Sequence, residues 1–184
     1  MTGLTHVALI RGINVGGKNP VPMARLRDVL AACGFEGVRT YIQSGNVVLR
    51  AAGSTEAQVT AAIEEALRAD FDVETVVVTV TADALRAAIS QAPLGFGEAP
   101  GEYLDDVVFL RSHIDPANVH PHVRMRDGVD SCWVGPGVLY FRRLEARRTA
   151  SYLSKIIALP VYKDMTIRNW RTTTALAGML DGPS

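Results

Sequence analysis

The segment from Ala8 to Asn46 reads ALIRGINVGGKNPVPMARLRDVLAACGFEGVRTYIQSGN and decides the first half of the predicted fold. It begins in a continuously apolar run, residues 7–10, which is typical of a strand covered by other elements. Pro20 and Pro22 delay any helix until about Met23, after which apolar residues recur at helical spacing as far as Cys33. Two β-rich runs, 38–43 and 46–50, then flank Ser44-Gly45, a break typical of a tight hairpin. The segment therefore predicts a strand, a helix and a hairpin, in that order.

The residues after this hairpin complete a known pattern. Thr55 and Gln58 have the spacing of a capping box, so we expect a helix that buries Val59, Ile63, Ala66 and Leu67. A strand is predicted at 73–80, and Thr81 is expected to cap a further helix. The order β-α-β-β-α-β is typical of a ferredoxin-like fold.

The second half of the chain repeats this order less regularly. Strands are predicted at 107–110, 131–134, 138–142 and 165–168. A short helix is expected between Asp115 and Pro121, and a longer one, capped by Thr149, with Leu153, Ile156 and Ile157 inward. We therefore predict an α+β protein of two ferredoxin-like β-α-β-β-α-β halves, each with an antiparallel sheet covered by helices, as a duplication would produce.

A Gly/Pro-rich stretch at 94–103 is interpreted as a linker between an N-terminal half, 1–93, and a C-terminal half with its terminal helix, 104–184. Charge also changes near this point. The chain holds 8 basic and 13 acidic residues up to position 110, and 11 basic and 6 acidic residues after it. We interpret this asymmetry as two halves that attract each other, with a basic ligand face as the alternative.

The composition narrows the class of protein. Lys and Arg together number 19, as do Asp and Glu, so binding of extended nucleic acid, which usually needs a basic excess, is not expected. No signal peptide is visible, and no apolar run approaches the ~20 residues of a membrane helix. Cys33 and Cys132 form no Cys-x-x-Cys pair. We predict a cytoplasmic protein without a membrane partner, in which both thiols are buried and structural.

Two polar loops carry the most site-like chemistry. In the predicted topology the first two strands run in the same direction, which places the loop after the first strand and the following hairpin at one end of the sheet. The candidate ligand-binding residues are Arg11, Asn14, Gly16, Gly17 and Lys18 in the loop, and Gln43, Ser44 and Asn46 in the hairpin. Glycine amides can cradle an anion, and arginine can hold a carboxylate or phosphate through two hydrogen bonds. The alternative is structural, with Arg11 and Asn14 tying the loop to the hairpin.

Other motifs are weaker. Gly12-x-x-x-x-Gly17-Lys18 nearly matches a P-loop, but Asn19 replaces the hydroxyl that binds Mg²⁺, and the two prolines exclude the following helix. The histidines at 113, 120 and 122 fit no metal motif, so no metal and no cofactor is expected. Ser151 and Lys155 lie four residues apart, but a capped helix start explains them more simply than a nucleophile pair. The arginine pairs 142–143 and 147–148 are interpreted as a solvated turn, with phosphate contact as the alternative.

At residues 11–18, 40–48 and 166–170 the sequence resembles a bacterial family, the domain of unknown function 1697 family. The resemblance implies a cytosolic α+β fold and carries no reaction. The family motif Arg-Asn-Trp-Asn-Thr-Val-x-Lys-Leu becomes Arg-Asn-Trp-Arg-Thr-Thr-Thr-Ala-Leu at 168–176, so Arg171 and Ala175 depart from it. Arg168, Asn169 and Trp170 are further candidates for contact with a base or an anion. The favoured interpretation is that Asn169 caps the last helix and Trp170 anchors it.

The sequence thus predicts binding of an anionic small molecule, a nucleotide or a nucleic-acid end at the first loop and hairpin. Two alternatives stay open, an enzyme of unassigned class that uses the same pocket and an interaction module in which the loops brace an interface. No oligomeric state is indicated.

Overall fold

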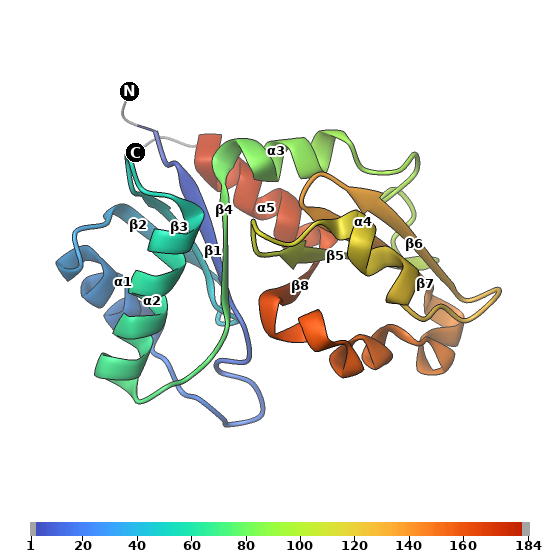
Figure 1. Cartoon of the computed structure of the whole chain (residues 1–184), viewed down its shortest axis with the longest axis horizontal. Helices are drawn as coiled ribbons and strands as arrows, with labels where there is room; N and C mark the ends of the chain where they lie inside the picture. The colour runs from blue at the N-terminus through green and yellow to red at the C-terminus, as the bar shows by residue number, and fades with distance from the viewer. Residues whose placement is uncertain (1–2, 182–184) are drawn as a thin grey trace. The chain divides into compact units, whose positions relative to one another are not determined.

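The computed structural model describes residues 3–181 and contains two four-stranded antiparallel sheets packed with helices (Figure 1). The α+β class with two ferredoxin-like halves is therefore confirmed. Contacts divide the chain into two compact units: the first runs to Leu85 and resumes at Leu176, and the second is Arg86–Ala175. These boundaries fall within two helices, and residues 94–103 lie inside the second unit. A linker at 94–103 between separate domains stays a prediction.

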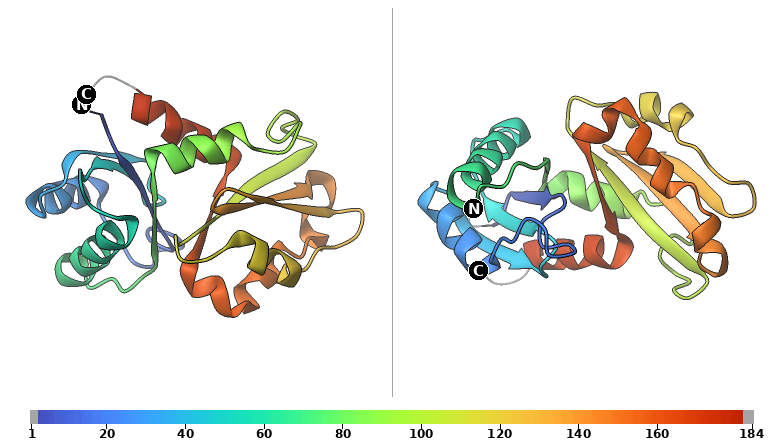
Figure 2. Two further views of the ribbon diagram at one scale, coloured as in Figure 1. Left: turned by 45° about the horizontal axis from the view of Figure 1, so that its top comes forward. Right: turned by 90° about the horizontal axis from the view of Figure 1, so that it is seen from below.

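The first sheet consists of β1 (His6–Ile10), β2 (Glu36–Tyr41), β3 (Asn46–Arg50) and β4 (Val77–Thr81), in the order β2-β3-β1-β4. Every neighbouring pair is antiparallel, so β1 and β2 run in the same direction, as predicted. The helices α1 (Met23–Ala32) and α2 (Glu56–Phe71) lie beside this sheet in both views of Figure 2. Their apolar faces meet the sheet in one core, in which Ile10, Leu26 and Ile63 are fully buried.

Local chemistry fixes the ends of the helices in this unit. The Thr55 hydroxyl accepts the Gln58 N–H while the Gln58 side chain accepts the Thr55 N–H, which confirms the capping box of α2. The predicted buried face of α2 is also confirmed. The helix α3 (Ala82–Ser90) begins where the Thr81 hydroxyl accepts the Ala84 N–H at 3.0 Å, as predicted. Such N-caps each stabilise a helix by about 1 kcal/mol.

The second sheet has the same strand order as the first. Its strands are β5 (Tyr103–Leu110), β6 (Asp130–Gly135), β7 (Val138–Leu144) and β8 (Met165–Asn169), in the order β6-β7-β5-β8. Corresponding hydrogen bonds close the two sheets at the end of the first strand. In the first sheet the N–H groups of Ile10 and Arg11 donate to the backbone carbonyls of Gly45 and Val76, respectively. In the second sheet the N–H groups of Leu110 and Arg111 donate to the backbone carbonyls of Gly137 and Asp164.

The prediction of a longer helix capped by Thr149 is wrong. Three short 3₁₀ helices take its place, η2 (Glu145–Ala150), η3 (Leu153–Ala158) and η4 (Pro160–Asp164), and they follow one another along the second sheet (orange in Figure 2). A 3₁₀ helix has three residues per turn, so Leu153 and Ile156 of η3 both reach the core, and Leu159, in the extended link between η3 and η4, packs against it as well. Ile157, one position on, is 60% exposed rather than inward.

The other predicted helices of this half form. The Asp115 carboxylate caps the short helix α4 (Pro116–Val119), which continues into a 3₁₀ turn, η1 (His120–His122). The last helix is α5 (Trp170–Asp181), and the Asn169 side chain accepts the Thr172 N–H at 2.8 Å. Asn169 is therefore the cap that the sequence predicts.

The two cysteines differ in exposure. Cys132 is buried, as predicted, and burial raises the pKa of its thiol to about 12. The prediction is wrong for Cys33, which is exposed. Cys33 is the C-cap of α1, and Gly34 turns the chain at φ +91° immediately after it, so the helical periodicity no longer directs this side chain into the core. Within residues 3–181, no helix has the length and apolar character needed to cross a membrane.

Candidate functional site

The loop at 11–19 and the hairpin at 41–46, together called the rim here, meet at one end of the first sheet. The topology places them there because β1 and β2 both end at this edge and β3 starts from it. The Ile10 N–H donates to the Gly45 carbonyl at 2.7 Å, and the Asn14 side chain donates to the Gln43 carbonyl at 3.0 Å. Gly45 has φ +80°, and a Cβ there would lie 2.8 Å from both Cβ and O of Ile10. Glycine is therefore required where the two parts of the rim touch.

Asn14 ties the rim together. Its Nδ2 donates to the carbonyls of Val21, at 2.8 Å, and Gln43, and its Oδ1 accepts the Val21 N–H at 2.7 Å. An asparagine side chain has two N–H donors and one carbonyl oxygen, so each of these groups has a partner. Asn14 itself has φ +56°, a left-handed conformation that asparagine tolerates better than most residues. Its role is therefore to hold the loop against the hairpin.

Asn46 shapes the hairpin from inside. It is fully buried, and its Nδ2 donates to the Tyr41 carbonyl at 3.1 Å and the Ser44 hydroxyl at 3.0 Å. Arg11 is fixed at the other side of the rim, where its N–H donates to Val76 at 2.9 Å and its carbonyl accepts the Thr75 hydroxyl. These contacts set the backbone of the rim before any ligand arrives.

The tip of the loop, Val15-Gly16-Gly17-Lys18, projects beyond these ties. It is a tight turn in which the Lys18 N–H donates to the Val15 carbonyl at 3.0 Å. Gly16 and Gly17 have φ values of +58° and +74°, as the two central residues of a type I′ turn require. Both glycines and Lys18 are exposed, and the N–H groups of Gly16 and Gly17 donate to no other residue that the structure describes. Two backbone amides and one ammonium group thus come from three consecutive exposed residues.

The candidates at 168–170 belong to the second unit. Arg168 on β8 is 9% exposed, and its Nη1 donates to the Thr166 hydroxyl and the Ile167 carbonyl, both at 2.9 Å. Burial lowers the pKa of Arg168 to about 10, because the charged form loses solvation. The Trp170 ring packs edge-to-face on Phe96 at a centroid distance of 5.2 Å. Asn169 and Trp170 therefore have the structural contacts that the favoured interpretation expects.

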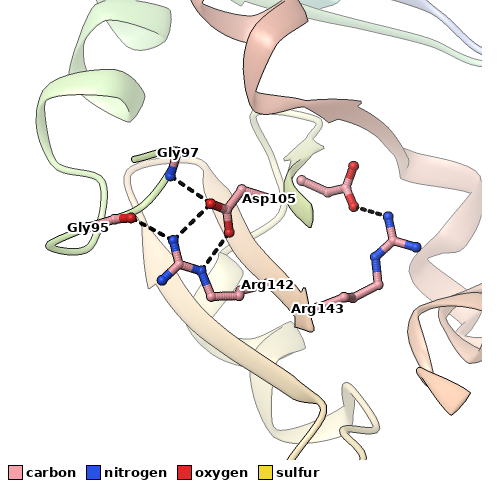
Figure 3. A network of polar contacts seen from close by, with 6 residues as sticks. Gly95, Gly97, Asp105, Arg142 and Arg143 are labelled. Carbon is pink, nitrogen blue, oxygen red and sulfur yellow. Dashed lines mark hydrogen bonds and ion pairs between the residues drawn. The ribbon is translucent and has the colours of Figure 1, made fainter. Parts of the chain in front are cut away.

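The sequence reasoning missed a polar network in the second unit, drawn in Figure 3. Arg142 donates to both carboxylate oxygens of Asp105, at 2.7 and 2.8 Å, and to the Gly95 carbonyl at 2.7 Å, while the Gly97 N–H donates to Asp105 at 2.6 Å. The solvated turn expected at 142–143 is wrong, because both arginines lie on β7 and pair with aspartates of β5. Adjacent Asp-Asp and Arg-Arg pairs at the ends of two predicted strands, 107–110 and 138–142, were the signal that could have found it. The network holds the loop at 95–97, so that Phe96 packs against Tyr140.

Arg143 and Asp106 form the second pair of this network, at 2.5 Å. Burial raises the pKa of the Asp106 carboxyl, and the positive charge of Arg143 opposes that shift. Both pairs join β5 to β7, which makes a structural role the direct interpretation of this network.

A cavity in the first unit and the metal-ligand side chains are the other candidates for binding chemistry. A cavity of about 310 Å³ lies at the other end of the first sheet, lined by Cys33, Glu36, Arg50 and Ser54 among others, with Arg50 and Glu36 ion-paired. For metals, the described part of the chain holds no group of three or more His, Cys, Asp or Glu side chains in a suitable arrangement. His120, one of the histidines weighed above, is hydrogen-bonded to the Cys132 carbonyl at 3.0 Å.

Comparison with known proteins gives a family and a structural relative. A family model described as "Protein of unknown function (DUF1697)" matches residues 4–140. The structure is similar to that of the conserved bacterial protein SP0830 from Streptococcus pneumoniae, with a TM-score of 0.81 and 26% identity over 96% of this chain and 98% of that one. No curated protein matches the sequence significantly. Since the family model spans most of the chain, the protein belongs to the DUF1697 family.

Proposed function

We propose that this is a cytoplasmic protein that binds an anionic ligand at the rim of its first sheet. The ligand class comprises anionic small molecules, nucleotides and nucleic-acid ends. The observation that carries the proposal is the exposed tip at 15–18, where two amides that donate to no residue between 3 and 181 stand next to Lys18. Consecutive free backbone N–H groups attract anions, and a lysine beside them adds a full positive charge.

The residues of the rim divide into two groups. Asn14, Gly45 and Asn46 position the backbone, and their polar groups are engaged inside the protein. Gly16, Gly17, Lys18 and Gln43 are exposed and contact the ligand. Because the first group fixes the loop in advance, binding does not have to order it, which preserves affinity.

A purely structural role explains the first group and the two glycines of the turn, but not the exposed side chains of Lys18 and Gln43. The bonds from Asn14 and Ile10 already join the loop to the hairpin. The tip at 15–18 lies outside those bonds, and a Cβ at Gly16 or Gly17 would meet nothing within 4 Å. The positive φ values of Gly16 and Gly17 explain why glycine occupies this turn, whereas the turn does not require the exposed lysine that follows it.

Isothermal titration tests the proposal with inorganic phosphate, nucleotides, sugar phosphates and short 5′-phosphorylated oligonucleotides. Lys18→Ala is expected to weaken binding about tenfold, since a hydrogen bond to a charged group contributes about 1.5 kcal/mol or more. Lys155→Ala removes an equally exposed lysine from the other unit and should leave affinity unchanged. If no compound in the panel binds, or if the two variants lose affinity equally, the proposal is contradicted.

A further inference from the structure

The rim carries two exposed apolar side chains beside its anion-binding tip. Val15 is 61% exposed and Ile42 is 52% exposed. Asn14 and Gln43 are bonded to each other, and Val15 and Ile42 are their direct neighbours in the sequence. The hydrogen bond between Asn14 and Gln43 therefore brings the backbone beside Val15 close to the backbone beside Ile42, on the rim that also carries Gly16 and Lys18.

Ile42 occupies a backbone conformation that disfavours it. Its φ is +48°, in the left-handed region, where a β-branched side chain is a genuine outlier and where asparagine or glycine is preferred. Half of the side chain is in solvent, so burial in the core does not compensate for this conformation. Hairpin geometry and core packing thus both fail to explain an isoleucine here, and strained residues of this kind cluster at ligand sites.

Gln43, which follows Ile42 in the chain, adds an exposed polar side chain to the rim. Its backbone carbonyl accepts from Asn14, but its exposed side-chain amide is hydrogen-bonded to no other residue between 3 and 181. An amide presents a donor and an acceptor side by side, which matches the edge of a nucleobase.

Building on the proposed function, we infer that the ligand is a nucleoside phosphate. The phosphate binds the amides of Gly16 and Gly17 and the Lys18 ammonium group. The base lies against Val15 and Ile42, with its hydrogen-bonding edge toward Gln43. A sugar phosphate would leave the apolar side chains without a partner, and an acyl phosphate would leave the Gln43 amide without one. A nucleoside phosphate uses all three features.

Isothermal titration compares AMP, GMP, CMP and UMP with ribose 5-phosphate and inorganic phosphate. At least one nucleotide is expected to bind about tenfold more tightly than ribose 5-phosphate, because only the nucleotide buries the apolar side chains. Ile42→Asn should lower the affinity for that nucleotide about fivefold and leave the affinity for ribose 5-phosphate unchanged. Gln43→Ala should reduce the difference in affinity among the four nucleotides, since it removes the group that contacts the base edge.

The variants separate lost contact from lost folding. Asparagine suits the left-handed backbone at position 42, so Ile42→Asn should melt no lower than the wild type. Ile157→Asn removes a similarly exposed isoleucine from η3 and should change neither affinity. Equal affinity for nucleotides and ribose 5-phosphate, or equal losses for both in Ile42→Asn, overturns this inference and leaves the anion site standing. Absence of binding by all six probes also overturns this inference, and the proposed function falls only if the phosphorylated oligonucleotides and sugar phosphates of the wider panel fail to bind too.

Discussion

Replacing Asn14 by alanine tests how the rim is held together. The substitution removes three side-chain hydrogen bonds, two to Val21 and one to Gln43. Each such bond contributes about 1 kcal/mol net to stability. Alanine at φ +56° adds about 1 kcal/mol of conformational cost relative to asparagine. Asn14→Ala is therefore expected to lower the free energy of unfolding by about 3 to 4 kcal/mol.

Asn19→Ala is the matched control. Asn19 also has a left-handed backbone, with φ +48°, but its side chain makes only one bond to the described residues, to the Gly12 carbonyl at 3.1 Å. Its loss should lower the free energy of unfolding by about 1 to 2 kcal/mol. Urea denaturation followed by circular dichroism measures both values. If Asn14→Ala destabilises the protein no more than Asn19→Ala, the three bonds of Asn14 do not hold the rim, and the argument for a pre-formed site fails.

Three further predictions concern other contacts. Gly45→Ala should lower the free energy of unfolding by about 3 kcal/mol or more, because the new Cβ would lie 2.8 Å from Ile10. Gly12→Ala is the control: Gly12 has φ +67° and nothing within 4 Å of the added Cβ, so the loss should be about 1 kcal/mol. Equal losses for the two variants in urea denaturation would refute the clash. Burial raises the pKa of Asp106 above 3.8, so ionisation of this carboxyl opposes folding. Relative to Asp106→Asn, the wild type should therefore lose stability as the pH rises from below 3.8 through the raised pKa. A difference in melting temperature between the two proteins that stays constant from pH 3 to 7 would contradict this. A chromogenic disulfide reagent should titrate only Cys33 in the native protein and both thiols in denaturant, since Cys132 is buried and its pKa is raised to about 12; rapid loss of two native thiols would show that the second sheet opens readily.

The amino-acid sequence alone determined the element order of the first half and, with it, the rim. Strand directions in a β-α-β-β unit follow from the connections: a helix returns the chain so that the next strand is parallel to the first, and a hairpin reverses it. The loop at 11–19 and the hairpin at 41–46 had to share an edge once those elements were identified. Caps at Thr55, Thr81 and Asn169 were also predictable, because a cap depends on residues only two or three positions away.

Tertiary structure decided which side chains of the rim face solvent. Asn14 and Lys18 are both polar loop residues in the sequence. Only the contacts with Val21 and with Gln43, which is 29 residues away along the chain, show that Asn14 is engaged while Lys18 is exposed. The same reason applies to Arg142, which a strand pairing brings to Asp105. It also applies to η3, in which Leu153 and Ile156, three residues apart, pack into the core. Helical and strand periodicity are local properties of the chain, whereas exposure and hydrogen-bond partners depend on which distant segments pack together.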